Sequence, residues 1–319
     1  MNKLLISRNA IKSEIIMEKL LKKFDVEFFD TNELESMLTD LENFSVWIHF
    51  DTLITDNFIK FQDSLQYLIT TTTGTTHISP NFRIANERKI ISLESFIHKM
   101  SNISSTAEHA WALMMAFHHK ISEASESVNS GNWNRDHFIR CRQLRNSTIG
   151  IIGFGRLGKI TKKYAESFGA NILVNELRFD KNPRSIFQKI DFVSLTNLLE
   201  KSDYVFIHAS ANENTNPIIT KEILHQIKTP FVLINTSRGR LVDETAVLEY
   251  VDKGIIKAYL ADVLKDEDEN VKITNSKLLS SKANKNRIVI TPHIGGASLD
   301  AMFYCENLLY LELIRRLKI

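Results

Sequence analysis

Short apolar runs alternate with amphipathic stretches along the first hundred residues of the chain. The runs have the length of strands, and the stretches between them repeat apolar residues at helical spacing, as at Ile11, Ile15 and Leu20. The predicted strands are Leu4–Ser7, Val26–Phe29, Ser45–Phe50, Leu65–Thr73 and Lys89–Leu93. The predicted helices are Ile11–Lys23, Glu33–Leu41 and Asp56–Gln62. Strands that alternate with helices indicate a parallel sheet covered by helices on both faces.

A long helix, predicted from Ser105 to about Ser125, leads into a second alternating unit. Glu108 stands three residues after Ser105, which suits a capping box at the start of this helix. The strands predicted after it are Thr148–Gly153, Asn171–Glu176, Tyr204–His208, Phe231–Asn235, Ala258–Val263 and Arg287–Thr291. The helices predicted with them are Arg156–Phe168, Leu195–Lys201, Lys221–Ile227, Glu244–Lys253 and Ala297–Arg316. The expected fold class is therefore α/β, with two doubly wound parallel-sheet domains.

Composition and charge exclude several classes of protein. The 40 basic and 38 acidic residues among 319 leave a formal charge of +2, so neither nucleic acid nor an anionic membrane is expected as a partner. No stretch approaches 18 consecutive apolar residues, and the apolar run at Leu4–Ile6 is too short for a signal-peptide core. Two distant cysteines, Cys141 and Cys305, exclude a disulfide framework, and we expect a cytoplasmic protein.

A glycine-rich hexapeptide, Gly153-Phe154-Gly155-Arg156-Leu157-Gly158, follows the predicted strand Ile149–Ile152 and opens a helix. In this context the first glycine allows a tight turn, the second allows the backbone to approach a pyrophosphate, and the third allows close helix packing. Glu176 ends the next strand, where a carboxylate can bind the ribose hydroxyls of NAD and repel the 2′-phosphate of NADP. Because the guanidinium of Arg178 could bind that phosphate, NADP stays an alternative cofactor.

Three further residues could together reduce a 2-keto acid. Arg238 follows a strand and could hold a carboxylate bidentately. His293, in Thr291-Pro292-His293, could donate a proton to the carbonyl oxygen, and Glu267 could orient and charge its imidazole. On spacing alone, the acidic neighbours Asp266, Asp268 and Glu269 are equal candidates for that carboxylate.

Several stretches of the chain resemble the D-isomer-specific 2-hydroxyacid dehydrogenases. This resemblance decides between the candidate carboxylates. The resemblance is strongest from about residue 64 to 300 and includes STAEH at 105–109, IGIIGFGRLG at 149–158, INTSRGRLVDETAVLEYVDKG at 234–254, LADVLKDE at 260–267 and TPHIGG at 291–296. It implies that Arg238 binds substrate, that His293 is the acid/base and that Glu267 is its partner. Asp268 departs from the proline that often follows this glutamate in the family.

The resemblance also implies a cofactor, a substrate and a division of the chain. Residues 105–293 would form a Rossmann NAD-binding domain, and residues 1–104 with 294–319 a flavodoxin-like substrate domain. Gly74 and Thr75 would bind the substrate, a small 2-hydroxy or 2-keto acid, together with Arg238 and His293. The expected NAD ligands are Gly153, Gly155, Arg156, Leu157, Gly158, Glu176, Ala209, Thr236, Asp262 and Thr106, with Asp262 at the nicotinamide carboxamide and Thr106 near that pocket.

Some expectations concern assembly and rival functions. By family analogy the segment around Trp133 would anchor a symmetric homodimer. No metal site is expected at His118–His119, because no acidic residue stands in ligand spacing.

The hydroxyl-rich run Thr70–Thr76 suits either a strand end or the binding of a hydroxylated substrate. The alternative function is a catalytically weak NAD-sensing scaffold or corepressor of the same fold; a formate dehydrogenase is disfavoured, since the Asn and His pattern for formate is not found.

Overall fold

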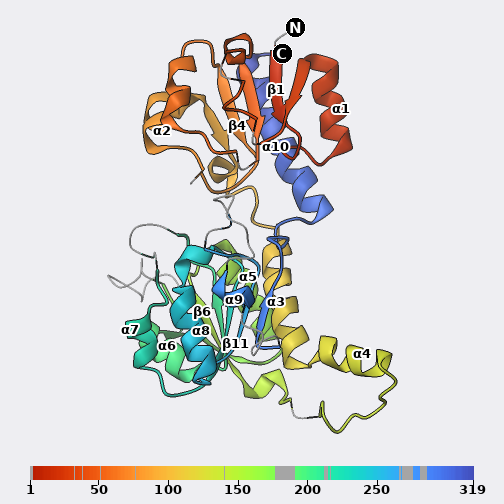
Figure 1. Cartoon of the computed structure of the whole chain (residues 1–319), viewed down its shortest axis with the longest axis vertical. Helices are drawn as coiled ribbons and strands as arrows, with labels where there is room; N and C mark the ends of the chain where they lie inside the picture. Colours follow the sequence, from red (N-terminus) through yellow and green to blue (C-terminus); the bar gives the residue numbers. More distant parts are fainter. Residues whose placement is uncertain are drawn as a thin grey trace. The chain divides into compact units, whose positions relative to one another are not determined.

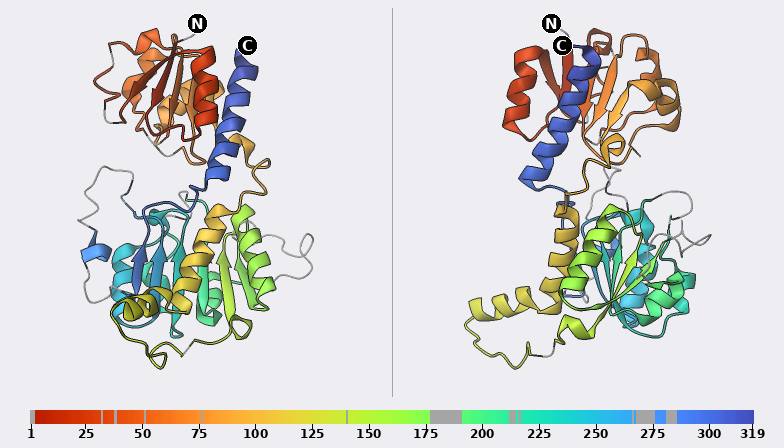
Figure 2. Two further views of the ribbon diagram at one scale, coloured as in Figure 1. Left: turned by 90° about the vertical axis from the view of Figure 1, so that its right-hand side faces the viewer. Right: turned by 180° about the vertical axis from the view of Figure 1, so that it is seen from behind.

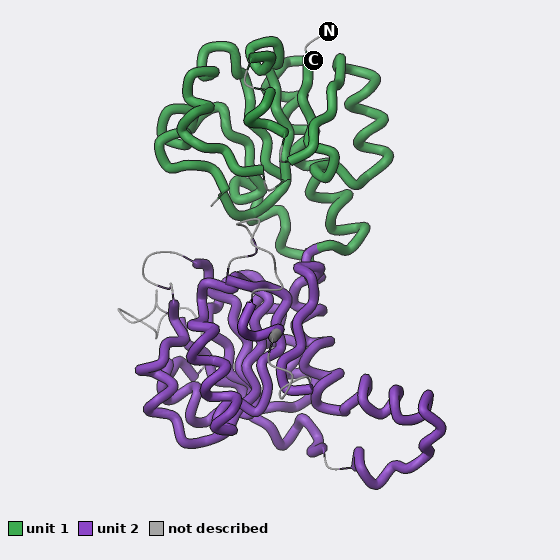
Figure 3. Tube along the Cα trace, in the orientation of Figure 1, with its two compact units in different colours: residues 1–103, 297–319 green, residues 104–296 purple. Residues whose placement is uncertain are grey.

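The chain forms two compact units, residues 1–103 with 297–319 (unit 1) and residues 104–296 (unit 2), shown in Figure 3. The structure is a computed structural model (Figure 1). It describes residues 3–31, 33–37, 39–50, 52–75, 77–139, 141–176, 191–211, 215, 217–265, 267, 276–280 and 286–319. The sequence had placed the two boundaries after residues 104 and 293.

Unit 1 contains a parallel sheet of five described strands in the order β2-β1-β3-β4-β5. This is the flavodoxin-like order. Its strands are β1 (Lys3–Ser7), β2 (Asp25–Phe29), β3 (Val46–His49), β4 (Tyr67–Thr70) and β5 (Ile90–Ser92). Its helices are α1 (Glu14–Lys23), α2 (Pro80–Asn86) and α10 (Leu299–Leu317), with the 3₁₀ helices η1 (Leu41–Asn43), η2 (Asp56–Phe61), η3 (Glu87–Lys89) and η4 (Leu93–Phe96).

Unit 2 contains a parallel sheet of seven described strands in the order β12-β11-β10-β9-β6-β7-β8. The strands are β6 (Thr148–Ile152), β7 (Asn171–Asn175), β8 (Asp191–Phe192), β9 (Tyr204–Ile207), β10 (Phe231–Asn235), β11 (Ile256–Ala261) and β12 (Ile288–Ile290). The helices are α3 (Ser105–His118), α4 (Ile121–Asn129), α5 (Arg156–Ser167), α6 (Leu195–Lys201), α7 (Lys221–His225), α8 (Glu244–Asp252) and α9 (Lys277–Ser280), with the 3₁₀ helices η5 (Leu144–Asn146) and η7 (Gly239–Leu241). The order reverses between β6 and β9, and this switch point is where α/β folds bind ligands.

Alternating side chains of each buried strand separate two apolar layers in unit 1. In β1, Leu4 and Ile6 belong to the cluster that α1 and α10 complete, whereas Leu5 belongs to a second cluster with Trp47 and Phe58. Successive residues of a strand point to opposite faces, so helices on both sides can bury the sheet. The predicted α/β class with two doubly wound parallel-sheet domains is confirmed.

Unit 2 is built in the same way. Helix α3 packs Trp111 and Met114 onto the face of the sheet that carries Val232 and Leu260, and α8 packs onto the opposite face. The indole of Trp111 stacks on the ring of Phe206 with their centroids 5.4 Å apart. Since both faces are covered, the strand ends and their loops are the parts left for chemistry.

Three predicted helices of the sequence analysis were wrong in type or extent. The predicted helix Glu33–Leu41 is a series of tight turns in its described residues, such as Ser36 N–H to Glu33 O at 2.9 Å, and Leu34 and Leu41 are still buried. Apolar residues three or four apart suit tight turns as well as an α-helix. The predicted helix Asp56–Gln62 is the 3₁₀ helix η2.

The long helix predicted from Ser105 to Ser125 is broken. Helix α3 ends at His118, and α4 begins at Ile121 after Lys120, whose φ is +53°. Figure 2 shows that α4 and the segment after it extend away from the sheet of unit 2. No glycine or proline marks this break, so the sequence carried no local signal for it. Within the described residues, no helix has the length and apolar character needed to cross a membrane.

Candidate active site

The turn between β6 and α5 needs glycine at two positions for reasons of backbone geometry. Gly153 has φ +91°, and a Cβ there would lie 2.6 Å from the backbone nitrogen of Ala209. A Cβ at Gly158 would overlap the carbonyl oxygen of Gly153. The two glycines therefore let α5 and the end of β9 approach the turn closely.

The second glycine of the motif, Gly155, faces open space within the part of the chain that the structure describes. Among the described residues, no atom beyond its chain neighbours lies within 4 Å of the position of a Cβ on Gly155, the N-cap residue of α5. The first turn of α5, which begins at Arg156 and includes Leu157, contains no acidic residue, and the cap has no side-chain hydrogen bond. The start of this helix can therefore accept an anion such as a pyrophosphate, because its backbone N–H groups point outward and the helix dipole is positive there.

The carboxylate of Glu176 lies beside the glycine turn. Its Oε2 accepts a hydrogen bond from the backbone N–H of Phe154 at 2.8 Å. This contact holds the carboxylate at the end of β7, next to the strand that leads into the turn. Arg178, the residue that left NADP open, lies outside the described residues.

Two neighbouring groups would also suit a nucleotide. The hydroxyl of Thr236 is buried and has no hydrogen-bond partner among the described residues, so a bound ligand could satisfy it. The carbonyl oxygen of Ala209 accepts a hydrogen bond from the Ser237 hydroxyl at 2.7 Å, which ties the loop after β9 to the loop after β10. With the open position at Gly155, these groups fit the expected cofactor.

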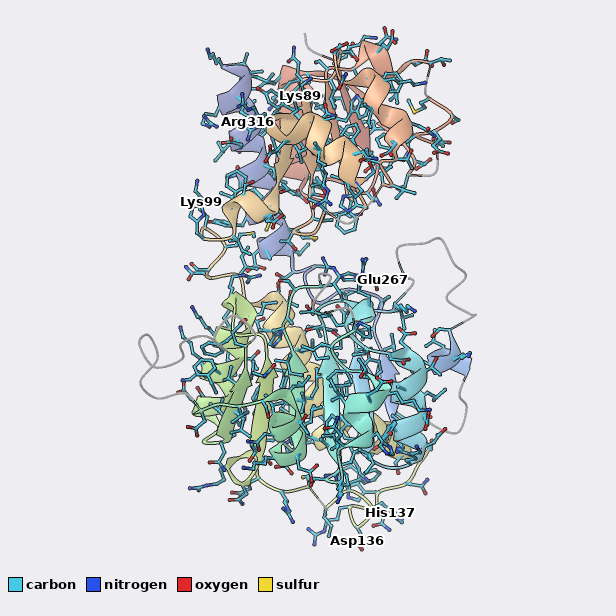
Figure 4. All side chains as sticks on the ribbon, turned by 90° about the vertical axis from the view of Figure 1, so that its left-hand side faces the viewer. Lys89, Lys99, Asp136, His137, Glu267 and Arg316 are labelled. Atoms are coloured by element: carbon cyan, nitrogen blue, oxygen red, sulfur yellow. The ribbon has the colours of Figure 1, made fainter. Side chains whose placement is uncertain are left out.

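The second half of the site lies at the carboxyl ends of β10, β11 and β12. These strands are adjacent and parallel, so the residues that follow them meet at one edge of the sheet. In Figure 4, Glu267 lies at this end of unit 2, and Asp136 and His137 lie at the opposite end.

His293 and Glu267 form a pair. Nδ1 of His293 lies 3.1 Å from Oε1 of Glu267, and the other carboxylate oxygen accepts the backbone N–H of Leu264 at 3.0 Å. The Glu267 side chain is 15% exposed and the imidazole 49% exposed, so the carboxylate is shielded while the ring still faces solvent. With Nδ1 held by Glu267, Nε2 is the atom that can exchange a proton with a substrate.

The surroundings raise the pKa of His293 above its usual value. The largest cause is the hydrogen bond to Glu267, which stabilises the charged ring. Burial and the guanidinium of Arg238 act in the opposite direction, and the charges of Glu267 and Asp262 add to the increase. The imidazole is therefore favoured as a proton donor near neutral pH.

Asp262 fixes the turn that carries His293. The side chain is 1% exposed, and its Oδ1 accepts the Thr291 hydroxyl at 2.6 Å and the Ile294 N–H at 2.9 Å. Its Oδ2 accepts the Gly295 N–H at 2.6 Å. His293 itself has φ +52°, which is uncommon for a residue with a side chain, so such bracing is needed to hold it.

His109 and Thr106, both in α3, adjoin the same turn. Nε2 of His109 lies 2.8 Å from the Thr291 hydroxyl and 3.4 Å from Oδ1 of Asp262. A Cβ on Gly296 would lie 3.7 Å from the Thr106 hydroxyl, which places that residue beside the end of the turn. His109 stands in the STAEH stretch at 105–109, but the sequence alone indicates no role for it.

Arg238 projects from a loop that is braced by Asn235. The Asn235 amide donates to the carbonyl oxygen of Arg238 at 3.0 Å, and its own carbonyl accepts the Ser237 N–H at 3.1 Å. The Arg238 guanidinium donates to the Ser237 carbonyl through Nη1 at 2.7 Å. Asn235 is a positioning residue that sequence reasoning missed, although it stands at the end of a buried strand where a polar residue is unusual.

The loop expected to bind substrate in unit 1 follows β4. The Thr72 hydroxyl donates to the carbonyl oxygen of Gly74 at 2.6 Å, and Nη1 of Arg83 donates to the Thr75 hydroxyl at 3.2 Å. His49, at the end of β3, is 1% exposed, and neither ring nitrogen has a hydrogen-bond partner in the described part of the chain. Burial lowers its pKa well below the usual value, so the ring is neutral. Thr76 lies outside the described residues.

Comparisons with known proteins identify the family of the chain. A sequence model described as "D-isomer specific 2-hydroxyacid dehydrogenase, NAD binding domain" matches residues 111–295. A hydroxypyruvate reductase of Thermotoga maritima is 27% identical over 289 residues, 91% of this chain and 89% of that protein. A D-3-phosphoglycerate dehydrogenase of Mycobacterium leprae is 31% identical over 201 residues, 63% of this chain but only 36% of that protein.

Solved structures share the fold over nearly the whole chain. An acyclic imino acid reductase in complex with NADPH and D-Arg has a TM-score of 0.79 and 26% identity, covering 99% of this chain and 96% of that one. A D-lactate dehydrogenase from Aquifex aeolicus, in complex with NAD and lactic acid, has a TM-score of 0.80 and 21% identity, covering 99% of this chain and 95% of that one.

Proposed function

Since the chain belongs to the D-isomer specific 2-hydroxyacid dehydrogenase family, we propose that it catalyses hydride transfer between NAD(H) and a small 2-hydroxy or 2-keto acid. The observation that carries the proposal is the pair formed by His293 and Glu267, with 3.1 Å between Nδ1 and Oε1. The pair shares one edge of the sheet with Arg238, whose charge acts on the imidazole. A proton donor and a carboxylate-binding cation are what reduction of a 2-keto acid requires of the protein.

In the reductive direction, NADH held at the glycine turn and Glu176 would supply the hydride for C2 of the keto acid. Arg238 binds the carboxylate of the substrate and fixes the face that C2 presents. Nε2 of His293 donates its proton to the oxygen on C2 as that oxygen becomes negative. Glu267 stabilises the charged imidazole before the transfer and keeps its orientation, because its other oxygen is held by the backbone of Leu264.

The proposed cofactor site comprises Gly153, Gly155, Arg156, Leu157, Gly158, Glu176, Ala209, Thr236, Asp262 and Thr106. We favour NAD over NADP because the Glu176 carboxylate lies against the glycine turn, where a 2′-phosphate would meet its negative charge. The engagement of both Asp262 oxygens by the turn of His293 favours a role in positioning that turn. Gly74 and Thr75 in unit 1 are the proposed additional substrate ligands.

A homodimer is the proposed assembly. Helix α4 has no buried residue, and the segment after it exposes Trp133 to 90% and Ile139 to 64%. Apolar side chains this exposed, on a segment that leaves the body of unit 2, suit a contact with a second copy of the chain. The proposed compartment is the cytoplasm, since two cysteines 164 residues apart in the sequence give no disulfide framework.

Turnover of a panel of 2-keto acids with NADH and with NADPH tests the proposed function. We expect NADH-dependent reduction of at least one keto acid, and that activity should be lost in His293→Ala. A second arm supplies each keto acid with ammonium or methylamine, because one relative in the comparisons reduces imino acids. Tight cofactor binding without turnover in either arm would overturn the proposal and support the scaffold alternative.

A further inference from the structure

Three potential metal ligands meet where the segment containing α4 leaves unit 2 and returns to it. His118 ends α3, His119 follows it, and Cys141 lies on the returning segment. One ligand atom from each of these three residues lies within 4.8 Å of the other two. This place is remote from the catalytic pair, because His118 contacts Tyr204 at the start of β9, whereas Glu267 lies at the end of unit 2 where the strands finish (Figure 4).

The imidazole of His118 is held in the tautomer that a metal ligand needs. Nε2 lies 2.7 Å from the carbonyl oxygen of Arg142, so it must carry a proton and donate it. With that proton on Nε2, Nδ1 is the nitrogen of the neutral ring that carries a lone pair. That lone pair accepts a hydrogen bond from the Tyr204 hydroxyl at 2.5 Å. In a metal-binding histidine, the ring nitrogen that does not bind the metal commonly donates its proton to a carbonyl oxygen in this way.

The other two ligand atoms already stand at a spacing that suits zinc. Sγ of Cys141 lies 3.6 Å from Nδ1 of His119. Zinc bonds of about 2.3 Å to sulfur and about 2.0–2.1 Å to nitrogen, at a tetrahedral angle, give an S···N separation of about 3.6 Å. Both side chains are exposed, so an ion can reach them.

A hollow of about 240 Å³ adjoins the two histidines and leaves room for an ion and a water ligand. Arg142 and Arg145 also line this hollow, and their positive charges disfavour a bare cation. The negative charge of a Cys141 thiolate would therefore be essential. Substitution of Cys141 is therefore the most decisive test of the site.

We propose that His118, His119 and Cys141 form a zinc site that closes the base of the segment from α4 to Cys141. Nδ1 of His118 exchanges the Tyr204 hydroxyl for the metal, and the thiol of Cys141 loses its proton on binding. His119 and Cys141 are 22 residues apart in the chain, so the bound ion would clamp the two ends of a long loop. A thiolate with two imidazoles selects a borderline-soft cation such as Zn²⁺ over Mg²⁺ or Ca²⁺.

The test is direct titration of the full-length protein with Zn²⁺, and with Co²⁺ as a spectroscopic probe. We expect one equivalent of Zn²⁺ to bind with an apparent Kd on the order of 1 μM or tighter at neutral pH, and more tightly as pH rises. Co²⁺ should give the intense visible bands of a tetrahedral site and a sulfur-to-cobalt charge-transfer band. Cys141→Ser should remove that band and weaken Zn²⁺ binding by at least about a hundredfold.

Matched variants separate this site from other ligands on the chain. Cys305→Ser removes the other cysteine, and His137→Gln removes an exposed histidine on the same segment; both should leave the affinity unchanged. His119→Gln should weaken binding, whereas Tyr204→Phe should strengthen it, because it frees Nδ1 of His118. Zn²⁺ binding that survives Cys141→Ser unchanged, or the absence of any binding tighter than about 100 μM, would overturn the proposal.

Discussion

Gly239 packs directly against the backbone of Leu264. A Cβ on Gly239 would overlap the carbonyl group of Leu264 and the nitrogen of the next residue. Gly239 follows Arg238, and the N–H of Leu264 holds the Glu267 carboxylate. This contact of two backbones therefore sets the separation between the loop of the guanidinium and the loop of the carboxylate.

Replacing Gly239 with alanine should damage stability and activity together. Relief of the overlap requires the two loops to move apart, and overpacking of this kind costs roughly 1–3 kcal/mol. We expect a lower free energy of unfolding in a denaturant titration and a lower kcat/KM, because Arg238 and Glu267 would both shift. A variant with the stability and kcat/KM of the unsubstituted protein would show that the contact is not rigid.

Gly155→Ala, unlike the replacement of Gly239, should weaken cofactor binding without loss of stability. Apart from its chain neighbours, no atom of the described residues lies within 4 Å of its Cβ position, so the substitution should leave the free energy of unfolding nearly unchanged. If a pyrophosphate occupies that space, the added methyl group should weaken NADH binding by on the order of tenfold, about 1.4 kcal/mol. Fluorescence titration with NADH measures this affinity. An unchanged affinity would place the cofactor elsewhere.

Arg238→Lys tests the proposed carboxylate clamp. Lysine keeps the charge but loses the planar fork that binds a carboxylate through two hydrogen bonds. We expect kcat/KM for keto-acid reduction to fall by at least on the order of a hundredfold, roughly 2.7 kcal/mol, while NADH affinity stays the same. Near-normal turnover would remove Arg238 from the site.

Asp262→Asn distinguishes a positioning role from a cofactor role. An amide offers one acceptor oxygen in place of two, so the N–H of Ile294 or of Gly295 would lose its partner. The loss should cost about 1–3 kcal/mol of stability and lower kcat through His293. Thermal unfolding and steady-state kinetics measure both quantities. Weaker NADH binding at unchanged stability would instead assign Asp262 to the cofactor.

Local patterns predicted most of the fold, since the buried strands and the helices after them follow apolar periodicity. The turns at Glu33–Met37 and the break at Lys120 were missed because their spacing is shared with helices and no breaker residue marks them. At the site, Arg238, Glu267 and His293 lie in recognisable motifs. The bracing by Asn235 and His109, and the approach of Cys141 to His118, depend on contacts between distant residues that spacing does not reveal.

The pH dependence of keto-acid reduction tests the central claim that Glu267 holds His293 in its protonated form. Because the hydrogen bond to Glu267 raises the pKa of His293, the rate should hold at low pH and fall as pH rises through that raised value. Oxidation of the hydroxy acid needs the neutral ring and should show the mirror profile.

The decisive measurement is kcat/KM against pH for Glu267→Gln beside Asp266→Asn and Asp268→Asn. Glutamine removes the charge that stabilises the imidazolium, so the fall in the reduction rate should move to lower pH while NADH binding persists. The two neighbouring variants should keep the profile of the unsubstituted protein. If either of them moves the fall in rate and Glu267→Gln does not, Glu267 is not the partner of the acid and the account is contradicted.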